Sequence, residues 1–335
     1  MSIVSNTKLE EVFSLALEER SPDIADLVSN ANAILYEMKK RGMWKSFSGP
    51  TIRERLLYSE TGSFVRYTGG DFLSPTPTEL FNDAEFTPRL GAVSVALTGE
   101  EILRNSGKNQ LIDVMSSHIK AGENELVDRF VEDMHSAGTA DNQIGGFQLM
   151  IPTTTNSGTY GGISRSSNAV WRTTTYDAHS AFTGVTQVTS STVRSIFNQI
   201  MHALSRGNRG PNLICAGTEH YNAYDLSLHA IQRINDVTGL GKAGFTSMKY
   251  YGAGKSVDVV LEGGIGTSMP SNTTYFMDTD AIAWRYHPDR NFVKFGGKQM
   301  PINQDMIVQH IGFMGELTLN NPLHTAKLYD STPGS

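Results

Sequence analysis

The chain has 335 residues, of which 39% are hydrophobic, enough for a substantial core in two domains or in one domain with large excursions. Its formal net charge of -6 argues against a dedicated nucleic-acid-binding surface, which normally needs a basic patch to neutralise phosphates. The single cysteine, Cys215, excludes an internal disulfide and a thiolate zinc site, and it favours a reducing compartment.

The N-terminal segment is acidic where a secretory signal needs a basic start, and no run of about 18 apolar residues occurs in the sequence. We therefore expect a soluble protein with no membrane partner. Apolar residues at helical spacing predict two short helices within residues 9–42, separated at Ser21 and Pro22.

A basic run follows the second of these helices. Cations at a helix C-terminus oppose the helix dipole, and this is the interpretation we favour over contact with an anionic partner. The run consists of Lys39, Lys40, Arg41 and Lys45.

Residues 51–97 change to short alternating runs separated by a Pro-rich stretch. Alternation at 52–56 and again at 93–97 predicts the two strands of a long hairpin with an irregular tip. Two strands alone bury little apolar surface, so such a ribbon is only marginally stable without further packing. We therefore expect it to lie against a partner, most simply a second copy of the same chain.

The stretch 108–138 carries one continuous apolar stripe at steps of three, four and seven residues. This pattern predicts a helix of about 45 Å at 1.5 Å per residue, well beyond the usual three or four turns. Gly122 is its expected weak point, at a cost of about 1 kcal/mol relative to Ala. A helix this long suggests a strut to which other parts of the chain attach.

Beyond residue 139, a segment rich in Gly, Ser and Thr predicts loops and short strands. A helix is then expected within 189–207, a buried strand at 211–218 and a further helix at 219–234, which together form a compact α/β unit. From Ser256 onward, runs bounded by Gly and Pro predict an antiparallel sheet. The sequence therefore indicates an α+β protein.

Four segments carry a family resemblance. They are YGGISRSSNAVWR at 160–172, PNLICAGTEHYNAY at 211–224, YFMDTDAIAWRYHPDRNF at 275–292 and IGFMGELTLNNPLHTAKLY at 311–329. With the long hairpin and long helix ahead of them, their order resembles the major capsid proteins of tailed bacteriophages with the Hong Kong 97-like fold. The resemblance spans nearly the whole chain, although none of the segments is diagnostic alone.

The resemblance implies four parts of the subunit. These are an N-terminal arm at 1–46, an E-loop at 47–97, a P-domain at 98–185 with 265–320, and an A-domain at 186–264 with 321–335. It also implies hexamers and pentamers that close an icosahedral head around a double-stranded DNA genome, with only incidental contact to the packaged DNA. The expected place of the protein is the virion, assembled in the host bacterial cytoplasm.

Two departures from the family bear on assembly. Some relatives are crosslinked through an E-loop lysine, but no lysine occurs between Lys45 and Lys108, so that crosslink is not expected here. Some relatives carry a fused N-terminal scaffolding segment of about a hundred residues, whereas fewer than fifty residues precede the expected E-loop. Because the sequence begins with Met1, we expect a separate scaffolding protein, together with portal and, as a further class, decoration proteins.

The residues expected to contact other subunits lie in the E-loop and in the basic run of the N-terminal arm. They are those that one subunit is least able to satisfy by itself. The E-loop set is Phe64, Arg66, Tyr67, Phe72, Leu73, Leu80, Phe81, Phe86 and Arg89, and the N-terminal set is Lys39, Lys40, Arg41 and Lys45.

Two alternatives stay open. One is an encapsulin-like compartment shell with the same fold, and the other is a soluble metal- or nucleotide-dependent enzyme. The glycines of GLGKAG at 239–244 lack the strand before and the helix after that a dinucleotide site needs. His287 and Asp289 with His310 imitate a facial iron triad, and Cys215 with His220 imitates a nucleophile and base. We expect no catalytic residue, cofactor or metal.

Overall fold

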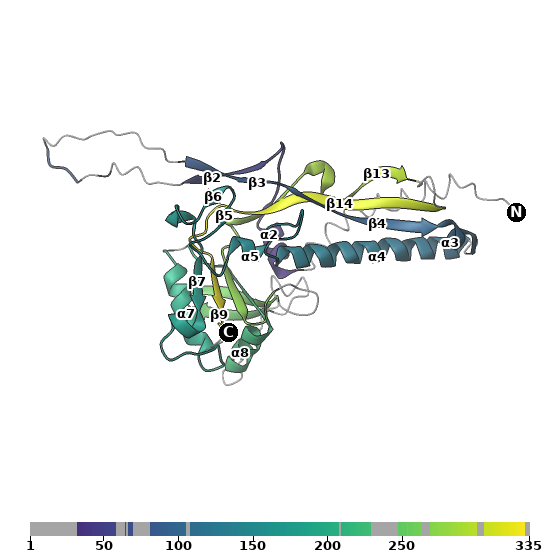
Figure 1. The fold of residues 1–335 in the computed structure, drawn as a ribbon. Coiled ribbons are helices and arrows are strands. Elements are labelled where there is room, and N and C mark those ends of the chain that lie inside the picture. The colour runs from purple at the N-terminus through teal and green to yellow at the C-terminus, as the bar shows by residue number, and fades with distance from the viewer. Residues whose placement is uncertain are drawn as a thin grey trace.

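The computed structural model describes residues 32–57, 64, 66–69, 81–104, 108–207, 209–228, 247–252, 254–262, 269–299 and 305–331. The described part of the molecule is elongated, with a long sheet and a long helix side by side and a second sheet below one end of them (Figure 1). Among the described residues, no helix is both long and apolar enough to cross a membrane.

A long sheet of five strands forms the upper layer in Figure 1. Its strands are β1 (Trp44–Ser46), β4 (Arg89–Thr98), β12 (Ile282–Tyr286), β13 (Val293–Gln299) and β14 (Met306–Leu319). The strand β14 lies at the centre and pairs antiparallel with β4, β12 and β13, whereas β1 joins β12 in parallel. The predicted antiparallel sheet of the last third is thus present, but it also recruits two strands from the first hundred residues.

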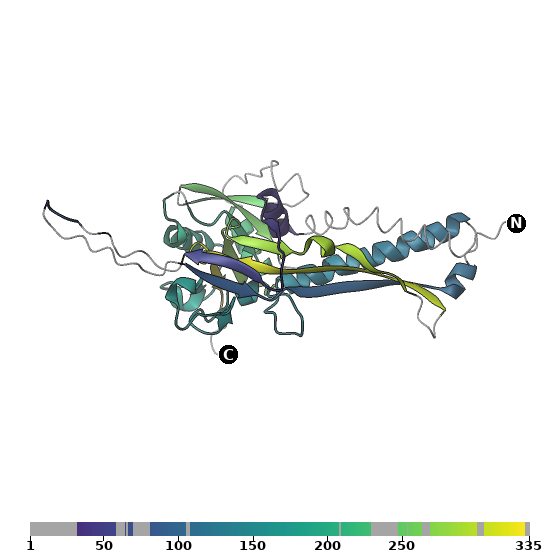
Figure 2. The same cartoon turned by 90° about the horizontal axis from the view of Figure 1, so that it is seen from above.

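The helix α4 (Lys108–Met134) runs along this sheet (Figures 1 and 2). It confirms the predicted long helix, which ends four residues earlier than expected. Its buried Phe130 fastens it to the sheet, with ring centroids 4.9 Å from Trp284, 5.3 Å from Phe292 and 5.2 Å from Phe313. These aromatic contacts bury large apolar side chains and fix the helix against the strands.

Gly122 has a different role from the one its propensity suggests. A Cβ atom at this position would lie 2.7 Å from Cγ2 of Val95, a buried residue of β4. The missing side chain therefore allows α4 and β4 to approach each other closely. What looks like a weak point in the helix is a packing requirement of the helix against the sheet.

We expect Gly122→Ala to lower the free energy of unfolding by about 1–3 kcal/mol, because overpacking against Val95 outweighs the helix-propensity gain of about 1 kcal/mol. Urea denaturation of the two proteins measures this difference. Adding Val95→Ala should remove the clash and restore much of the lost free energy of unfolding. A Gly122→Ala protein more stable than the parent would show that the contact is not tight.

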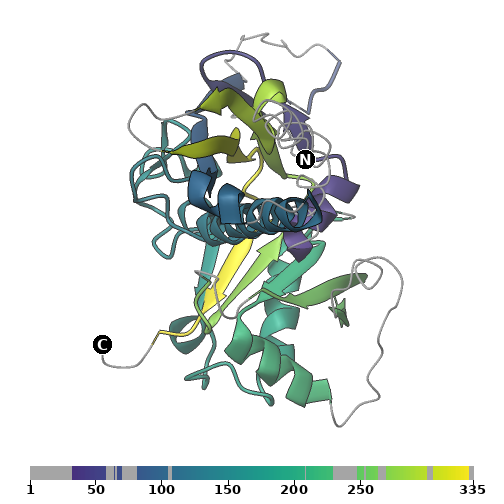
Figure 3. The ribbon, with the colours of Figure 1, turned by 90° about the vertical axis from the view of Figure 1, so that its right-hand side faces the viewer.

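A sheet of six strands builds the lower unit of Figure 1. In spatial order its strands are β7 (Thr174–Asp177), β15 (Ala326–Tyr329), β11 (Thr273–Met277), β8 (Leu213–Ala216), β10 (Lys255–Leu261) and β9 (Ser247–Gly252). Two of its pairs, β7 with β15 and β8 with β10, are parallel. Figure 3, an end-on view, shows this unit below α4 and the long sheet.

Two helices pack on the six-stranded sheet, α7 (Val193–Leu204) and α8 (Thr218–Leu228). Phe197 of α7 lies at the centre of their core, with ring centroids 5.6 Å from Tyr224 and 5.2 Å from Phe276. The helix, buried strand and helix predicted for this region are confirmed as α7, β8 and α8 over their described residues. They belong to one compact α/β unit.

The remaining described elements are short. They are α2 (Ala33–Lys40), α3 (Gly99–Arg104), α5 (Phe147–Met150), α6 (Ala178–Ala181), the pair β5 (Thr159–Tyr160) and β6 (Ile163–Ser164), and single 3-10 turns at Ala169–Trp171 and Pro288–Arg290. The helix α2 confirms the second of the two predicted N-terminal helices, and the first lies outside the described residues. The basic residues Lys39 and Lys40 occupy its last turn, as predicted.

The predicted hairpin is wrong in its second strand. Its first strand, β2 (Ile52–Leu57), pairs with β3 (Phe81–Phe86) and not with 93–97. The latter residues belong to β4, which pairs with β14 in the long sheet. The physical reason is burial: Val95 and Leu97 are buried and require the helix and sheet around them, which a projecting ribbon cannot supply.

Sheet membership also changes three expected boundaries. The strand β4 lies in the long sheet, although the expected E-loop reached residue 97. The strands β7 and β11 lie in the six-stranded sheet, although 98–185 and 265–320 were both expected in the part built on the long helix. Hydrogen-bonded neighbours far apart in sequence decide these memberships, and spacing along the chain does not reveal them.

Candidate inter-subunit surfaces

The two-stranded ribbon of β2 and β3 lies at the end of the molecule opposite α3 (Figures 1 and 2). Side chains alternate along β2, so that Ile52, Glu54 and Leu56 are buried while Arg53 and Arg55 are exposed. On the exposed side, Arg53 pairs with Glu85 at 2.9 Å and Arg55 lies 3.8 Å from Asp83. The buried side attaches the ribbon to the body of the subunit.

An ion pair fixes the base of the ribbon. Nε of Arg285 in β12 donates to Oε1 of Glu54 at 2.5 Å, and Nη2 donates to Oε2 at 2.9 Å. The hydroxyl of Thr318 in β14 donates to the same carboxylate at 3.0 Å. This bidentate contact between a buried carboxylate and a guanidinium sets the orientation of β2 relative to the long sheet.

A second attachment holds β3. The ring of Phe86 packs edge-on against Tyr160 with centroids 5.0 Å apart, and the amide of Glu85 donates to the carbonyl of Gly161 at 2.9 Å. Gly161 has a φ of 56°, and a Cβ atom there would lie 2.8 Å from the Phe86 ring. A glycine is needed at this point for both its backbone conformation and its close approach to β3.

Phe86 was predicted to contact another subunit, and this contact stays a prediction, although the side chain has little exposed surface left for it. Its side chain is only 7% exposed and belongs to the core of its own chain. At the base of the ribbon, the side chains of β3 point alternately to solvent and into the body of the subunit, and Phe86 occupies one of the inward positions.

Beyond the base, the described E-loop residues are exposed. Phe64 is 83% exposed and Tyr67 is 64% exposed, and Arg66 is exposed as well. Large aromatic side chains this accessible are typical of surfaces that become buried in an assembly. Phe72, Leu73 and Leu80 lie outside the described residues, as does the side chain of Phe81 in β3.

Arg89, at the start of β4, lies beside a buried carboxyl group. Arg89 and Glu316, which carries this carboxyl group, both line a small cavity of about 180 Å³ at the base of the ribbon. Burial raises the pKa of Glu316 to about 8, although Gly145 donates its amide to this carboxyl at 2.6 Å and the charge of Arg89 opposes the rise. The sequence does not reveal this group, because nothing in the strand pattern of β14 distinguishes it.

The basic residues of the N-terminal arm are largely engaged within their own chain. Lys40 lies 3.3 Å from Glu37, and Arg41 pairs with Asp280 at 3.1 Å. The ammonium group of Lys39 lies 5.6 Å from the ring centroid of Trp44. Lys45 is half-buried in β1. These contacts agree with the interpretation as a helix C-terminus, and contact with other subunits stays a prediction.

Exposed apolar side chains also occur where we did not predict contacts. Strand alternation is the signal that points to some of them, because Tyr251 in β9 and Leu261 in β10 each follow a buried neighbour in the sequence. Among the described residues beyond the E-loop stretch that ends at Leu90, the large exposed apolar side chains are Val170, Leu226, Tyr251, Leu261 and Leu323.

The residues considered for catalysis have other partners. Burial raises the pKa of the Cys215 thiol well above its usual value, which opposes a nucleophilic role. The ring of His220 is bonded to Thr274 at 2.8 Å and to Asp330 at 3.2 Å, so both of its nitrogens are used within the core.

The proposed iron triad is not assembled either. His310 lies 2.8 Å from the hydroxyl of Ser94 and stacks on Phe295, while His287 lies 3.8 Å from the exposed Asp289. Among the described residues, no group of three or more His, Cys, Asp or Glu side chains is arranged to hold a metal ion. The glycine-rich stretch 239–244 lies outside the described residues.

Comparison with known proteins rests on structure. No protein-family model matches the sequence, and no curated protein matches it significantly. Among solved structures, the capsid asymmetric unit of cyanophage A-1(L) is similar, with a TM-score of 0.63 and 15% identity over 88% of this chain and 92% of that one. The capsid of the empty GTA particle has a TM-score of 0.52 and 10% identity over 87% of this chain and 89% of that one.

The SrpI encapsulin of Synechococcus elongatus PCC 7942 has a TM-score of 0.49 and 8% identity over 85% of this chain and 84% of that one, a similarity too low to support any argument. At the identities of the two capsid structures, similarity establishes the fold and not the function. The predicted fold class is confirmed: the chain has the α+β Hong Kong 97-like fold, which it shares with the capsid structures of cyanophage A-1(L) and the GTA particle.

Proposed function

We propose that this chain is the major capsid protein of a tailed phage and self-assembles as hexamers and pentamers into an icosahedral head that encloses double-stranded DNA. The fold shared with the cyanophage A-1(L) capsid supports this function. The observation that carries the proposal is the ribbon, whose base is fastened to its own subunit while Phe64 and Tyr67 remain exposed. Such side chains are stabilised when another molecule covers them.

The four parts of the subunit follow the two sheets. The N-terminal arm comprises residues 1–46, and the E-loop comprises 47–88, ending before β4. The P-domain is built on α4 and the long sheet, and the A-domain on the six-stranded sheet with α7 and α8. This division keeps each hydrogen-bonded sheet within one part, except that β1 at the end of the N-terminal arm pairs with β12 of the long sheet.

The proposed role is structural, without catalysis, and the principal partner is the chain itself. Separate scaffolding and portal proteins, and decoration proteins as a further class, complete the proposed set, and the proposed location is the virion. Capsid proteins among the structural neighbours support a non-enzymatic role.

Negative-stain electron microscopy and mass measurement of the purified chain, alone and with its native neighbours, test the proposal. We expect closed particles of megadalton mass that contain DNA when formed in the infected host. Particles that hold a protein cargo and no genome would assign the chain to an encapsulin-like compartment. A small oligomer that stays small in the presence of its native neighbours would contradict both shell functions.

The exposed aromatic residues of the E-loop give a residue-level prediction. We expect the double variant Phe64→Ser and Tyr67→Ser to keep the melting temperature of the unassembled subunit and to lose most particle assembly, because both side chains are already exposed in the isolated subunit. Light scattering during assembly measures the effect.

A matched control keeps the apolar surface. The variant Phe64→Leu with Tyr67→Phe should assemble nearly as well as the parent. Normal assembly of the serine variant would remove these two side chains from the proposed contact.

A further inference from the structure

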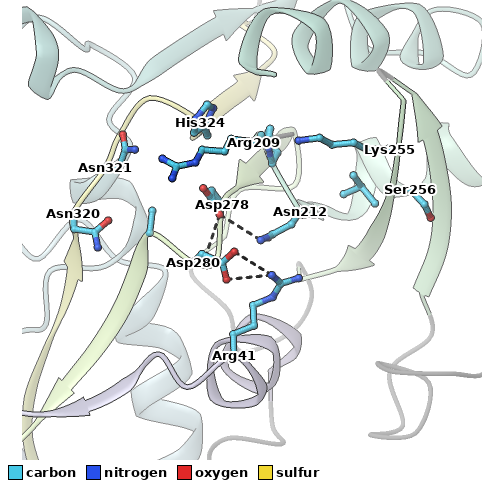
Figure 4. Close-up of a pocket in the computed structure, with 14 residues that line it drawn as sticks. Arg41, Arg209, Asn212, Lys255, Ser256, Asp278, Asp280, Asn320, Asn321 and His324 are labelled. Atoms are coloured by element: carbon cyan, nitrogen blue, oxygen red, sulfur yellow. Dashed lines mark hydrogen bonds and ion pairs between the residues drawn. The ribbon is translucent and has the colours of Figure 1, made fainter. Parts of the chain in front are cut away.

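A polar cavity of about 590 Å³ lies at the junction between the two sheets (Figure 4). The chain crosses from the six-stranded sheet to the long sheet at 278–281, between β11 and β12, and returns at 320–325, between β14 and β15. Both crossings contribute to the wall, together with residues before β8 and at the start of β10. We call this cavity the junction pocket. Its size is typical of a ligand site.

Three of the charged groups in the wall have hydrogen-bond or ion-pair partners among their neighbours. Arg41 makes contacts of 3.1 and 3.3 Å with the carboxylate of Asp280. Asp278 accepts from Nδ2 of Asn212 at 3.3 Å and from the amide of Asp280 at 3.2 Å. Burial raises the pKa of Asp278 above its usual value, which makes its charge easier to neutralise. None of these groups leaves a strong positive charge free.

The side chains of Arg209 and Lys255 differ from these charged groups in having no such partner at the described positions. Within the part of the chain that the structure describes, neither side chain has a carboxylate within ion-pairing distance. In Figure 4, the guanidinium of Arg209 reaches into the pocket between His324 and Asp278, and the side chain of Lys255 enters the same pocket, with its ammonium group near the base of the Arg209 side chain. Backbone hydrogen bonds of 2.9 and 3.1 Å between Arg206 and Arg209 fix the turn that presents Arg209. Two cations that line one cavity without an ion pair of their own among the described residues favour an anionic ligand.

We propose that the junction pocket binds a phosphate-type oxyanion between Arg209 and Lys255. A guanidinium fork and an ammonium group together supply several donors, which suits the three or more oxygens of a phosphate. The described lining has no Phe, Tyr or Trp on which a base could stack, so the phosphate itself is the recognised group.

Because the pocket lies between the two sheets, a bound anion would affect how the sheets are oriented relative to each other. Arg209 and Lys255 belong to the unit built on the six-stranded sheet, whereas Asp280 and Asn320 border strands of the long sheet. An anion held there contacts both sides of the junction and favours one relative orientation of the two sheets. Ligands that bind the folded arrangement stabilise it in proportion to their occupancy.

The test uses the full-length, unassembled chain, so its result does not depend on shell formation. Isothermal titration with inorganic phosphate, in chloride buffers of matched ionic strength, should show one site. The variants Arg209→Gln and Lys255→Gln should each weaken the affinity about tenfold or more, as expected for the loss of a charge-assisted contact. Lys120→Gln, on the exposed face of α4, is the matched control and should not change it.

A short duplex DNA distinguishes the two sources of phosphate. Competition of this DNA with inorganic phosphate would identify the nucleic-acid backbone as the ligand, and an unchanged phosphate affinity would identify a free anion. The proposal is overturned if phosphate fails to bind, if both pocket variants bind it as tightly as the parent, or if acetate and citrate bind and phosphate does not.

Discussion

Replacing Arg285 with Ala should lower the free energy of unfolding by about 3–5 kcal/mol, the loss expected when one member of a buried ion pair is removed. Glu54 is only 7% exposed and receives both nitrogen contacts from Arg285. Without the guanidinium, its carboxylate stays buried with the hydroxyl of Thr318 as its remaining hydrogen-bond partner among the described residues. Chemical denaturation of the unassembled subunit measures the loss.

An apolar replacement of both partners is the control. Glu54→Leu combined with Arg285→Met removes the two charges together and should recover most of the lost stability, because no buried charge is left unpaired. The ribbon should then keep its attachment through Ile52, Leu56 and Phe86. A stability of Arg285→Ala within about 1 kcal/mol of the parent, the range of an exposed pair, would show that solvent reaches Glu54.

The substitution Glu316→Gln should stabilise the subunit at pH 8 by about 2–4 kcal/mol and should have little effect at pH 4. The pKa of Glu316 is raised from 4.5 to about 8 by burial. The folded protein therefore binds a proton that the unfolded chain has released, and stability falls as pH rises from about 4.5 to 8. Each pH unit across this window changes the free energy by about 1.4 kcal/mol, and the neutral amide removes this dependence.

Urea denaturation across pH 4–9 tests the sign as well as the size. The parent and the Glu316→Gln variant should have equal stability at the acidic end and diverge as pH rises. Glu125→Gln, on the exposed face of α4, is the charge-matched control and should not reproduce the divergence. A variant that is less stable than the parent at pH 8 would mean that the carboxylate is ionised and well solvated in the folded subunit.

The parts of the fold that depend on local periodicity were predictable. The long apolar stripe gave α4 to within four residues of its end, and helical spacing gave α7. The pairing partners of the strands were not predictable, because β4 shows the same alternation whether it returns along a ribbon or joins β14. Contacts such as that of Val95 with α4 at Gly122 distinguish the two, and they join elements separate in the sequence.

The candidate contact residues show the same difference between local patterns, which the sequence reveals, and long-range contacts, which it does not. The expectation that one subunit cannot satisfy the E-loop residues by itself agrees with the exposure of Phe64 and Tyr67. It did not anticipate the burial of Phe86, because the inward side of β3 is set by Tyr160 and Gly161, more than seventy residues later. Glu54 and Arg285 escaped notice because their charges predict exposure, and only the folded structure brings them together.

A cryo-electron microscopy reconstruction of the particle formed by this chain tests the central claim most directly. We predict that β2 and β3 stay attached to their own subunit at the base of the ribbon and that Phe64 and Tyr67 are buried against a neighbouring one, with α4 and the long sheet unchanged in each copy. A ribbon that folds back onto its own subunit, with both aromatic side chains buried inside that subunit, would contradict this account.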